Sequence, residues 1–88
     1  MTITLNDSGC DPRDLALKPG AVTFKVTNSG SSGVTEFEIL DEADKVLGEI
    51  ENITPGIERD FSMTLEAGTF VTYCPGGETE RGTLTVSG

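Results

Sequence analysis

The chain has 88 residues, of which 15 are acidic, 6 are basic and none is histidine, so that its formal net charge is -9. A chain of this length forms one domain, here 1–88, with a small core. An acidic protein is repelled by phosphate backbones, so we expect no nucleic acid as a partner and favour metal cations or basic protein surfaces. No apolar run reaches the roughly 20 residues of a membrane helix, so we expect no membrane insertion.

From the N-terminal residues we expect no secretory signal. Met1 leads directly into Thr2-Ile3-Thr4-Leu5, which alternates as a strand does. We therefore expect either a cytoplasmic protein or a segment cut from a longer, processed precursor.

Short alternating segments separated by turn residues follow one another along the chain, and no segment has a convincing helical pattern. The predicted strands are 2–5, 15–17, 21–27, 34–40, 48–53, 57–65, 68–73 and 82–86. We interpret the acidic segment 41–47 as a turn. Seven to eight short strands with frequent turns predict an all-β fold, an antiparallel Greek-key β-sandwich.

Both cysteines lie where a predicted strand ends. Cys10 follows the first strand and opens a loop, and Cys74 ends the strand 68–73 just before Pro75-Gly76. In a sandwich both positions fall at the same end. The pair is then a disulfide, a metal site or two unused thiols, and a disulfide that closes more than sixty residues would contribute roughly 4 kcal/mol of stability.

Other common chemistry has no support in the sequence. Without histidine there is no Ser-His or Cys-His nucleophile pair, and the single cysteines do not form a Cys-x-x-Cys motif. No glycine-rich loop links a strand to a helix. We therefore expect no enzyme activity.

Three segments form a recognisable set. They are Leu15-x-Leu17-x-Pro19-Gly20, Asn28-Ser29-Gly30 ahead of Thr35-Glu36-Phe37, and Gly68-Thr69-Phe70-x-x-Tyr73-Cys74-Pro75-Gly76 ahead of Gly82-Thr83-Leu84. Together they resemble the cupredoxin family. Cupredoxins hold copper with two histidines, a cysteine and a methionine. Here Cys74 is kept, but those other places fall at Thr35 and near Gly77 and Arg81. A blue-copper site needs two imidazoles, so the resemblance implies the fold without conventional copper electron transfer.

Within that family the chain is similar to the N-terminal cupredoxin-like domain of EfeO-type periplasmic iron-uptake proteins. The similarity rests on Cys10-Asp11-Pro12, Glu36-Phe37-Glu38-Ile39-Leu40, Glu51-Asn52-Ile53-Thr54-Pro55-Gly56 and Cys74. It implies a metal site made of Cys10, Glu36 and Cys74. It also implies a periplasmic or extracytoplasmic location and, as partners, a second uptake domain or a membrane permease. The helical domain with a His-x-x-Glu motif that usually follows in this family is absent from these 88 residues.

Two thiolates and one carboxylate would suit Cu(II) or Zn(II) better than Mg²⁺ or Ca²⁺, and Fe(III) only with further oxygens from Asp11, Glu38 or water. The alternative without metal is that Glu36 and Glu38, which alternate outward on a strand, form a solvated face. For Met63 and Tyr73 we expect packing rather than ligation.

Two hypotheses of different classes therefore stand. The first is a monomeric metal-binding accessory domain that takes an iron or copper ion at Cys10, Glu36 and Cys74. The second is a disulfide-stabilised β-sandwich that acts as a structural or interaction module without metal. Electron transfer through an altered copper centre is a weaker third, because its ligands are missing.

Overall fold

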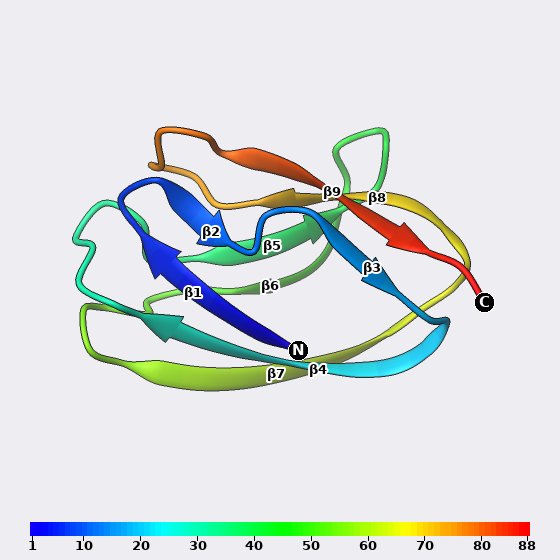
Figure 1. The fold of residues 1–88 in the computed structure, drawn as a ribbon, viewed down its shortest axis with the longest axis horizontal. Helices are drawn as coiled ribbons and strands as arrows, with labels where there is room; N and C mark the ends of the chain where they lie inside the picture. Colours follow the sequence, from blue (N-terminus) through cyan, green and yellow to red (C-terminus); the bar gives the residue numbers. More distant parts are fainter.

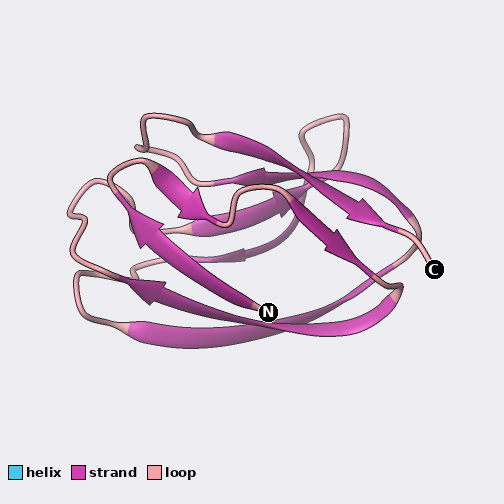
Figure 2. Cartoon of the chain, in the orientation of Figure 1, coloured by secondary structure: helices cyan, strands magenta, loops and turns pink.

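A computed structural model describes residues 1–88 and contains nine strands and no helix. The strands are β1 (Thr2–Asn6), β2 (Gly9–Asp11), β3 (Leu15–Leu17), β4 (Gly20–Asn28), β5 (Phe37–Leu40), β6 (Val46–Ile50), β7 (Glu58–Leu65), β8 (Gly68–Tyr73) and β9 (Arg81–Val86). Figure 1 and Figure 2 show them in two facing layers joined by short loops. The chain has no helix that is long and apolar enough to span a bilayer.

The two layers are a four-stranded sheet in the order β2-β1-β4-β7 and a five-stranded sheet in the order β3-β9-β8-β5-β6. The predicted β-sandwich is therefore confirmed. It is not purely antiparallel, because β1 pairs with β4 and β3 pairs with β9 in parallel. The ninth strand is the short β2, which we expected to be a loop, and β6 begins at Val46 rather than at residue 48.

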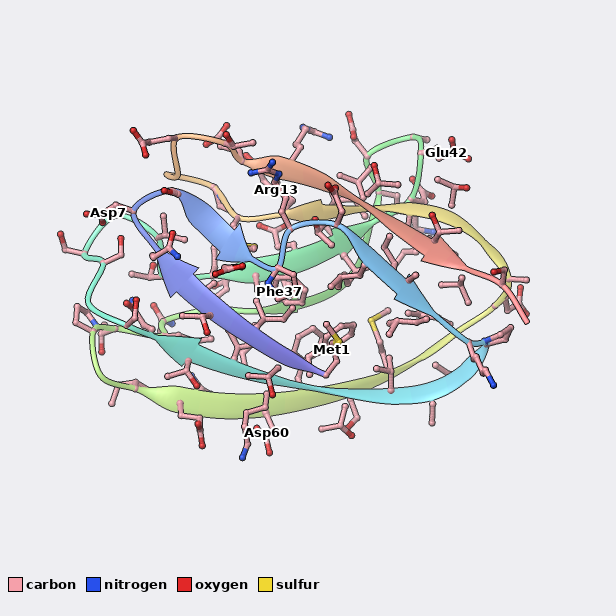
Figure 3. The ribbon with its side chains drawn as sticks, viewed as in Figure 1. Met1, Asp7, Arg13, Phe37, Glu42 and Asp60 are labelled. Carbon is pink, nitrogen blue, oxygen red and sulfur yellow. A yellow bond between two sulfur atoms is a disulfide. The ribbon has the colours of Figure 1, made fainter.

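The core lies between the sheets and is centred on three aromatic rings. The rings of Phe24 and Phe61 lie 5.2 Å apart between centroids, and Phe37 lies 5.2 Å from Phe24 and 6.0 Å from Phe61. Figure 3 shows Phe37 between the layers and Asp60 pointing away from them. Alternation along each strand explains why apolar side chains lie between the sheets and charged ones outside, because successive side chains point to opposite faces of a sheet.

A buried asparagine at the end of β4 fixes the neighbouring loops. The Asn28 side chain donates from Nδ2 to the carbonyl oxygens of Ser31, Val34 and Ile53, at 2.8, 3.1 and 2.8 Å. Its Oδ1 accepts from the backbone N–H groups of Gly30 and Ser31. One side chain therefore satisfies polar backbone groups of two separate loops, where water has little access.

A disulfide joins the two sheets. It links Cys10, in β2 of the four-stranded sheet, to Cys74, the residue after β8 of the five-stranded sheet, and the two Cα atoms lie 5.9 Å apart. That spacing is ordinary for a disulfide. The expectation that both cysteines lie at the same end of the sandwich is confirmed.

The loop between β8 and β9 packs closely against the turn between β1 and β2. The N–H groups of Glu78 and Thr79 donate to the carbonyl oxygens of Asp7 and Ser8, at 3.2 and 3.0 Å. Gly9 has a φ of 131° and lies against the Thr79 carbonyl, so a side chain there would collide with backbone as well as strain the chain. The two segments that carry the cysteines are thus held together by backbone contacts as well.

Replacing Asn28 by alanine should lower the free energy of unfolding by about 3 kcal/mol, because it leaves several buried backbone groups without a partner. Urea unfolding of both proteins measures this difference. Thr23→Ala is the matched control, since it removes only an exposed hydroxyl contact with Ser62 and should change stability by less than about 1 kcal/mol. Equal losses in the two variants would contradict the role assigned to Asn28.

Removing the disulfide by the double substitution Cys10→Ala and Cys74→Ala should lower the free energy of unfolding by about 4 kcal/mol. The bond closes a loop of sequence separation 64, and a closure of this length restricts the unfolded chain by about that amount. Urea unfolding of the oxidised protein, the reduced protein and the double variant measures the effect. A double variant as stable as the oxidised protein would show that the bond contributes nothing.

Candidate functional site: a carboxylate cluster beside a disulfide

The structure pairs two of the three predicted ligands with each other. Cys10 and Cys74 form the disulfide, and there is no free cysteine. Thiolates, not disulfide sulfurs, are the metal ligands. The set of Cys10, Glu36 and Cys74 therefore applies to the reduced protein only, and for that state it stays a prediction.

Glu36 lies in a different group of possible ligands. One ligand oxygen from each of Glu36, Glu38 and Glu49 falls within 4.8 Å of the others. Phe37 and Ile39 are fully buried in the core, so strand alternation turns Glu36 and Glu38 to the outer face of the five-stranded sheet. Cys74 is itself fully buried. The carboxylates and the disulfide therefore occupy opposite sides of this sheet.

The pairing of β5 with β6 builds the cluster. Glu38 lies directly opposite Glu49 in the antiparallel register, and directly opposite residues have side chains on the same face. Glu36 lies one alternation step before Glu38, and Glu51 one step after Glu49. Four acidic side chains thus lie close together, two on the strands β5 and β6 and two at residues that directly flank them.

Burial and the repulsion between neighbouring carboxylates raise the pKa values of Glu38 and Glu49 in this cluster. Glu38 keeps only 8% of its surface exposed. Burial raises the pKa of its carboxyl from 4.5 to about 7, with further contributions from a hydrogen bond to Glu36 and from the charges of Glu36, Glu49 and Glu51. Desolvation and the neighbouring Glu51 also raise the pKa of Glu49. Glu38 therefore keeps its proton at a pH where ordinary carboxyls have lost theirs.

No basic side chain neutralises the cluster. The ion pairs of the structure are Lys25 with Glu58 and Arg81 with Asp44. Arg59 donates to the backbone carbonyl of Glu51, at 3.1 Å, and not to a carboxylate. Buried or crowded charges are normally paired with an opposite charge or with a metal. Glu36, Glu38 and Glu49 are therefore the residues of this structure that could hold a cation.

On the other side of Glu38 the sheet continues with Tyr73, which lies directly opposite it on β8. The Arg81 guanidinium lies 5.1 Å from the centre of the Tyr73 ring, and it pairs with Asp44 at 2.8 Å. Tyr73 therefore packs, as expected, and the charge of Arg81 is directed to Asp44 rather than to the cluster.

The donor atoms indicate what the cluster could bind. Three carboxylates form an all-oxygen set, which suits hard cations with oxygen ligands. The chain contains no histidine, so its residues do not fit a blue-copper centre, which needs two imidazoles and a thiolate.

Sequence reasoning missed Glu49. It gave Glu36 as a metal ligand and Glu38 as a further oxygen ligand, with a solvated face as the alternative for both, and for Glu38 the burial shows that this alternative is wrong. Two signals were available: the acidic residues repeat at a spacing of two in both Glu36-Phe37-Glu38 and Glu49-Ile50-Glu51. Placing the two pairs side by side required the strand register, which the sequence does not reveal.

Comparison with known proteins identifies close relatives. Over 85 residues, covering 97% of this chain, it is 36% identical to the iron uptake system component EfeO of Yersinia pseudotuberculosis. It is 29% identical over 86 residues to the EfeO component of Escherichia coli strain K12. In each case the match spans 22% of the relative's length.

Solved structures with the same fold include a copper protein. Auracyanin A of Chloroflexus aurantiacus, a "blue" copper protein, superposes with a TM-score of 0.81 at 15% identity, over 99% of this chain and 97% of its own. The reduced auracyanin of Roseiflexus castenholzii gives a TM-score of 0.80 at 14% identity, over 99% and 95% of the two chains. Identities this low show the fold alone. A model of the cupredoxin-like domain family matches residues 1–86, and the chain accordingly belongs to the cupredoxin-like family.

Proposed function

We propose that the chain is a metal-binding accessory domain of an EfeO-type iron-uptake system and that it takes an iron cation at Glu36, Glu38 and Glu49. The observation that carries the proposal is the gathering of three carboxylate oxygens within 4.8 Å without a basic partner. Glu51 extends the site at its rim. The iron is cargo rather than a cofactor of a reaction.

The free energy for binding comes from the repulsion already present in the cluster. The neighbouring carboxylates contribute to the raised pKa values of Glu38 and Glu49, and a multivalent cation can replace the protons held there. Partial burial of Glu38 strengthens its attraction to the ion, because charges interact more strongly where water is excluded. Glu36 and Glu49 stay more open to solvent, so the ion has a path in and out.

Similarity to the EfeO components supports iron as the cation. An oxygen-only ligand set agrees with a hard ion. Those relatives extend well beyond the matching region, so in this proposal a second uptake domain or a membrane permease receives the ion. A periplasmic or extracytoplasmic location follows from the same similarity.

A second candidate function is favoured by the disulfide. In this function the domain is a disulfide-bridged β-sandwich that serves as a structural or interaction module, and the carboxylates bind no metal. The Cys10, Glu36 and Cys74 set would operate only after reduction, with softer ions such as copper or zinc. Metal titration of the oxidised and reduced proteins separates these possibilities.

The oxidised protein should bind ferric iron supplied as its citrate complex, and Glu38→Gln should weaken this binding by about tenfold or more, because affinity follows the charge and number of the ligands. Glutamine keeps the shape of the side chain and removes its repulsion, so the variant should fold at least as well as the parent. Equilibrium dialysis with metal analysis measures the affinity.

The matched control is Asp60→Asn, which removes an exposed carboxylate on β7, in the other sheet. It removes one negative charge, as Glu38→Gln does, but should leave iron binding unchanged. Equal weakening in both variants would show that iron binds to general negative charge. Binding that appears only after reduction, and is lost in Cys74→Ser, would show that the metal binds at the cysteine thiols and not at the carboxylate cluster.

Without metal, stability should fall as the pH rises from about 4.5 to about 7 and then level off. The Glu38 carboxyl holds its proton up to about pH 7 in the folded protein, whereas the unfolded chain releases it from about pH 4.5, so deprotonation favours unfolding. Water at the rim screens the effect, and we expect a change of about 1 kcal/mol.

Urea unfolding across this pH range measures the effect of Glu38, with Glu38→Gln as the comparison. The variant should show a smaller decline in the free energy of unfolding, since only the other carboxyls still titrate. A variant that loses stability as steeply as the parent would contradict the assignment to Glu38.

A further inference from the structure

The strand β7 leaves one side of its backbone without a partner. It is the last strand of the four-stranded sheet and pairs only with β4, along all 8 of its residues. Outside that ladder, no backbone hydrogen bond of the chain involves residues 58–65. Figure 1 shows β7 along the rim of the sandwich, with β4 on one side of it. A free edge of this length is a template for a further strand.

Charged side chains protect only the first half of this edge. Glu58, Arg59 and Asp60 open the strand, and charges on an edge strand oppose pairing with another chain. The second half, Phe61–Leu65, contains no charged residue, no proline and no glycine. This half is therefore the part of the edge that a new strand could join.

An apolar groove lies beside the uncharged half of β7 and has a volume of about 370 Å³. Leu65 belongs to the hydrophobic core, and Met63 and Phe70 pack against it, so the groove gives access to the margin of the core. Leu47, from the edge strand β6 of the other sheet, keeps 40% of its surface exposed. The lining comes from both sheets and consists of Leu47, Met63, Thr64, Leu65, Glu66 and Phe70.

We propose that the Phe61–Leu65 edge and this groove together bind an extended segment of a basic partner protein, which adds to the sheet beside β7. The backbone of the segment pairs with the free N–H and C=O groups of β7. Every second side chain of the segment lies on the same face of the sheet as Met63 and Leu65. Apolar residues at those positions enter the groove, which gives the segment its alternating pattern.

The charge of this side of the molecule determines the kind of partner. Glu66 is the one charged residue in the lining of the groove. A basic segment is attracted to such an edge, whereas a second copy of the chain, with its own net charge of -9, is repelled. The edge strands β6 and β7 add three acidic residues and one basic residue, which are Glu49, Glu58, Asp60 and Arg59.

The docking surface does not depend on iron binding. The lining of the groove contains none of Glu36, Glu38 and Glu49, whose carboxylates are the proposed iron ligands. A failure of the iron proposal would therefore leave the docking proposal standing, and the reverse is also true.

The first test uses the unmodified oxidised protein and a synthetic peptide in which valine and threonine alternate, with two lysines at each end and both termini capped. The peptide should bind with a Kd below about 1 mM, and it should slow hydrogen exchange of the outward amides of β7. Two-dimensional NMR of the protein measures both effects. No binding up to that concentration, or slower exchange without any change in β7, would overturn the proposal. A dimer of the chain that excludes the peptide would assign the edge to a second copy and would also overturn it.

The second test asks whether the backbone of the peptide pairs with β7. In an extended strand the valine N–H groups all point to one side and the threonine N–H groups to the other. Methylation of all valine nitrogens in one peptide, and of all threonine nitrogens in another, should therefore abolish the binding of only one of the two. Equal affinities of the two methylated peptides would overturn strand addition.

The third test addresses the groove. Leu47→Ala should weaken binding of the lysine-flanked peptide by about fivefold, because the peptide then covers less apolar surface. Ile57→Ala is the matched control, since Ile57 is 42% exposed and lies outside the groove; it should change the affinity by less than about twofold. Equal weakening in the two variants would show that the groove takes no part in binding.

The fourth test addresses the charge of the partner. Replacing the lysines of the peptide by glutamates should weaken binding by about tenfold or more at low salt, and the difference should shrink as salt is added. Titration of both peptides at two ionic strengths measures this. Equal affinities at low salt would overturn the assignment of a basic partner.

Discussion

The side-chain amide of Asn28 holds the end of the sandwich at which the carboxylate cluster begins. It donates to the carbonyl oxygens of Val34 and Ile53, and the N–H of Ile53 in turn donates to the Thr35 carbonyl. These contacts bring the segment that enters β5 beside the segment that leaves β6. Glu36 and Glu51 lie next to those contacts, so the outer edge of the carboxylate cluster depends on a buried polar group that touches none of its members.

The same end of the molecule carries the disulfide and the carboxylate cluster, and the five-stranded sheet separates them. The disulfide sulfurs lie on its core side, where Cys74 is fully buried, while the carboxylates lie on its outer side. Strand alternation is the cause, since Cys74 and Tyr73 are neighbours in sequence and point to opposite faces. Oxygen and sulfur ligands are therefore separated in the oxidised protein, although both come from the ends of neighbouring strands.

Alternation and turn residues were enough to predict the sandwich, the β8–β9 hairpin and the common end that Cys10 and Cys74 share. They were not enough for β2, whose three residues carry little pattern, or for the start of β6, where the register shifts between Ile39 and Leu40. Glu49 was missed for the same reason, because its place opposite Glu38 depends on the register of β5 and β6. Local pattern shows which face a residue occupies, but only long-range pairing shows which residue lies beside it.

The buried Glu38 shows a related limit. A glutamate between two apolar residues of a strand normally faces water, and nothing in Phe37-Glu38-Ile39 indicates that its outer face is covered. The covering comes from strands β6 and β8 on either side. Burial of a polar residue is a tertiary property, and in this chain it marks the position where function is proposed.

β9 is the final strand of the chain, and yet it lies between β3 and β8, inside the five-stranded sheet. Until its residues are available, β3 has no partner in that sheet and β8 has an open edge. The fold thus cannot be completed from the N-terminus onward as the chain is made. The five-stranded sheet is therefore complete only once β9 has paired with both β3 and β8.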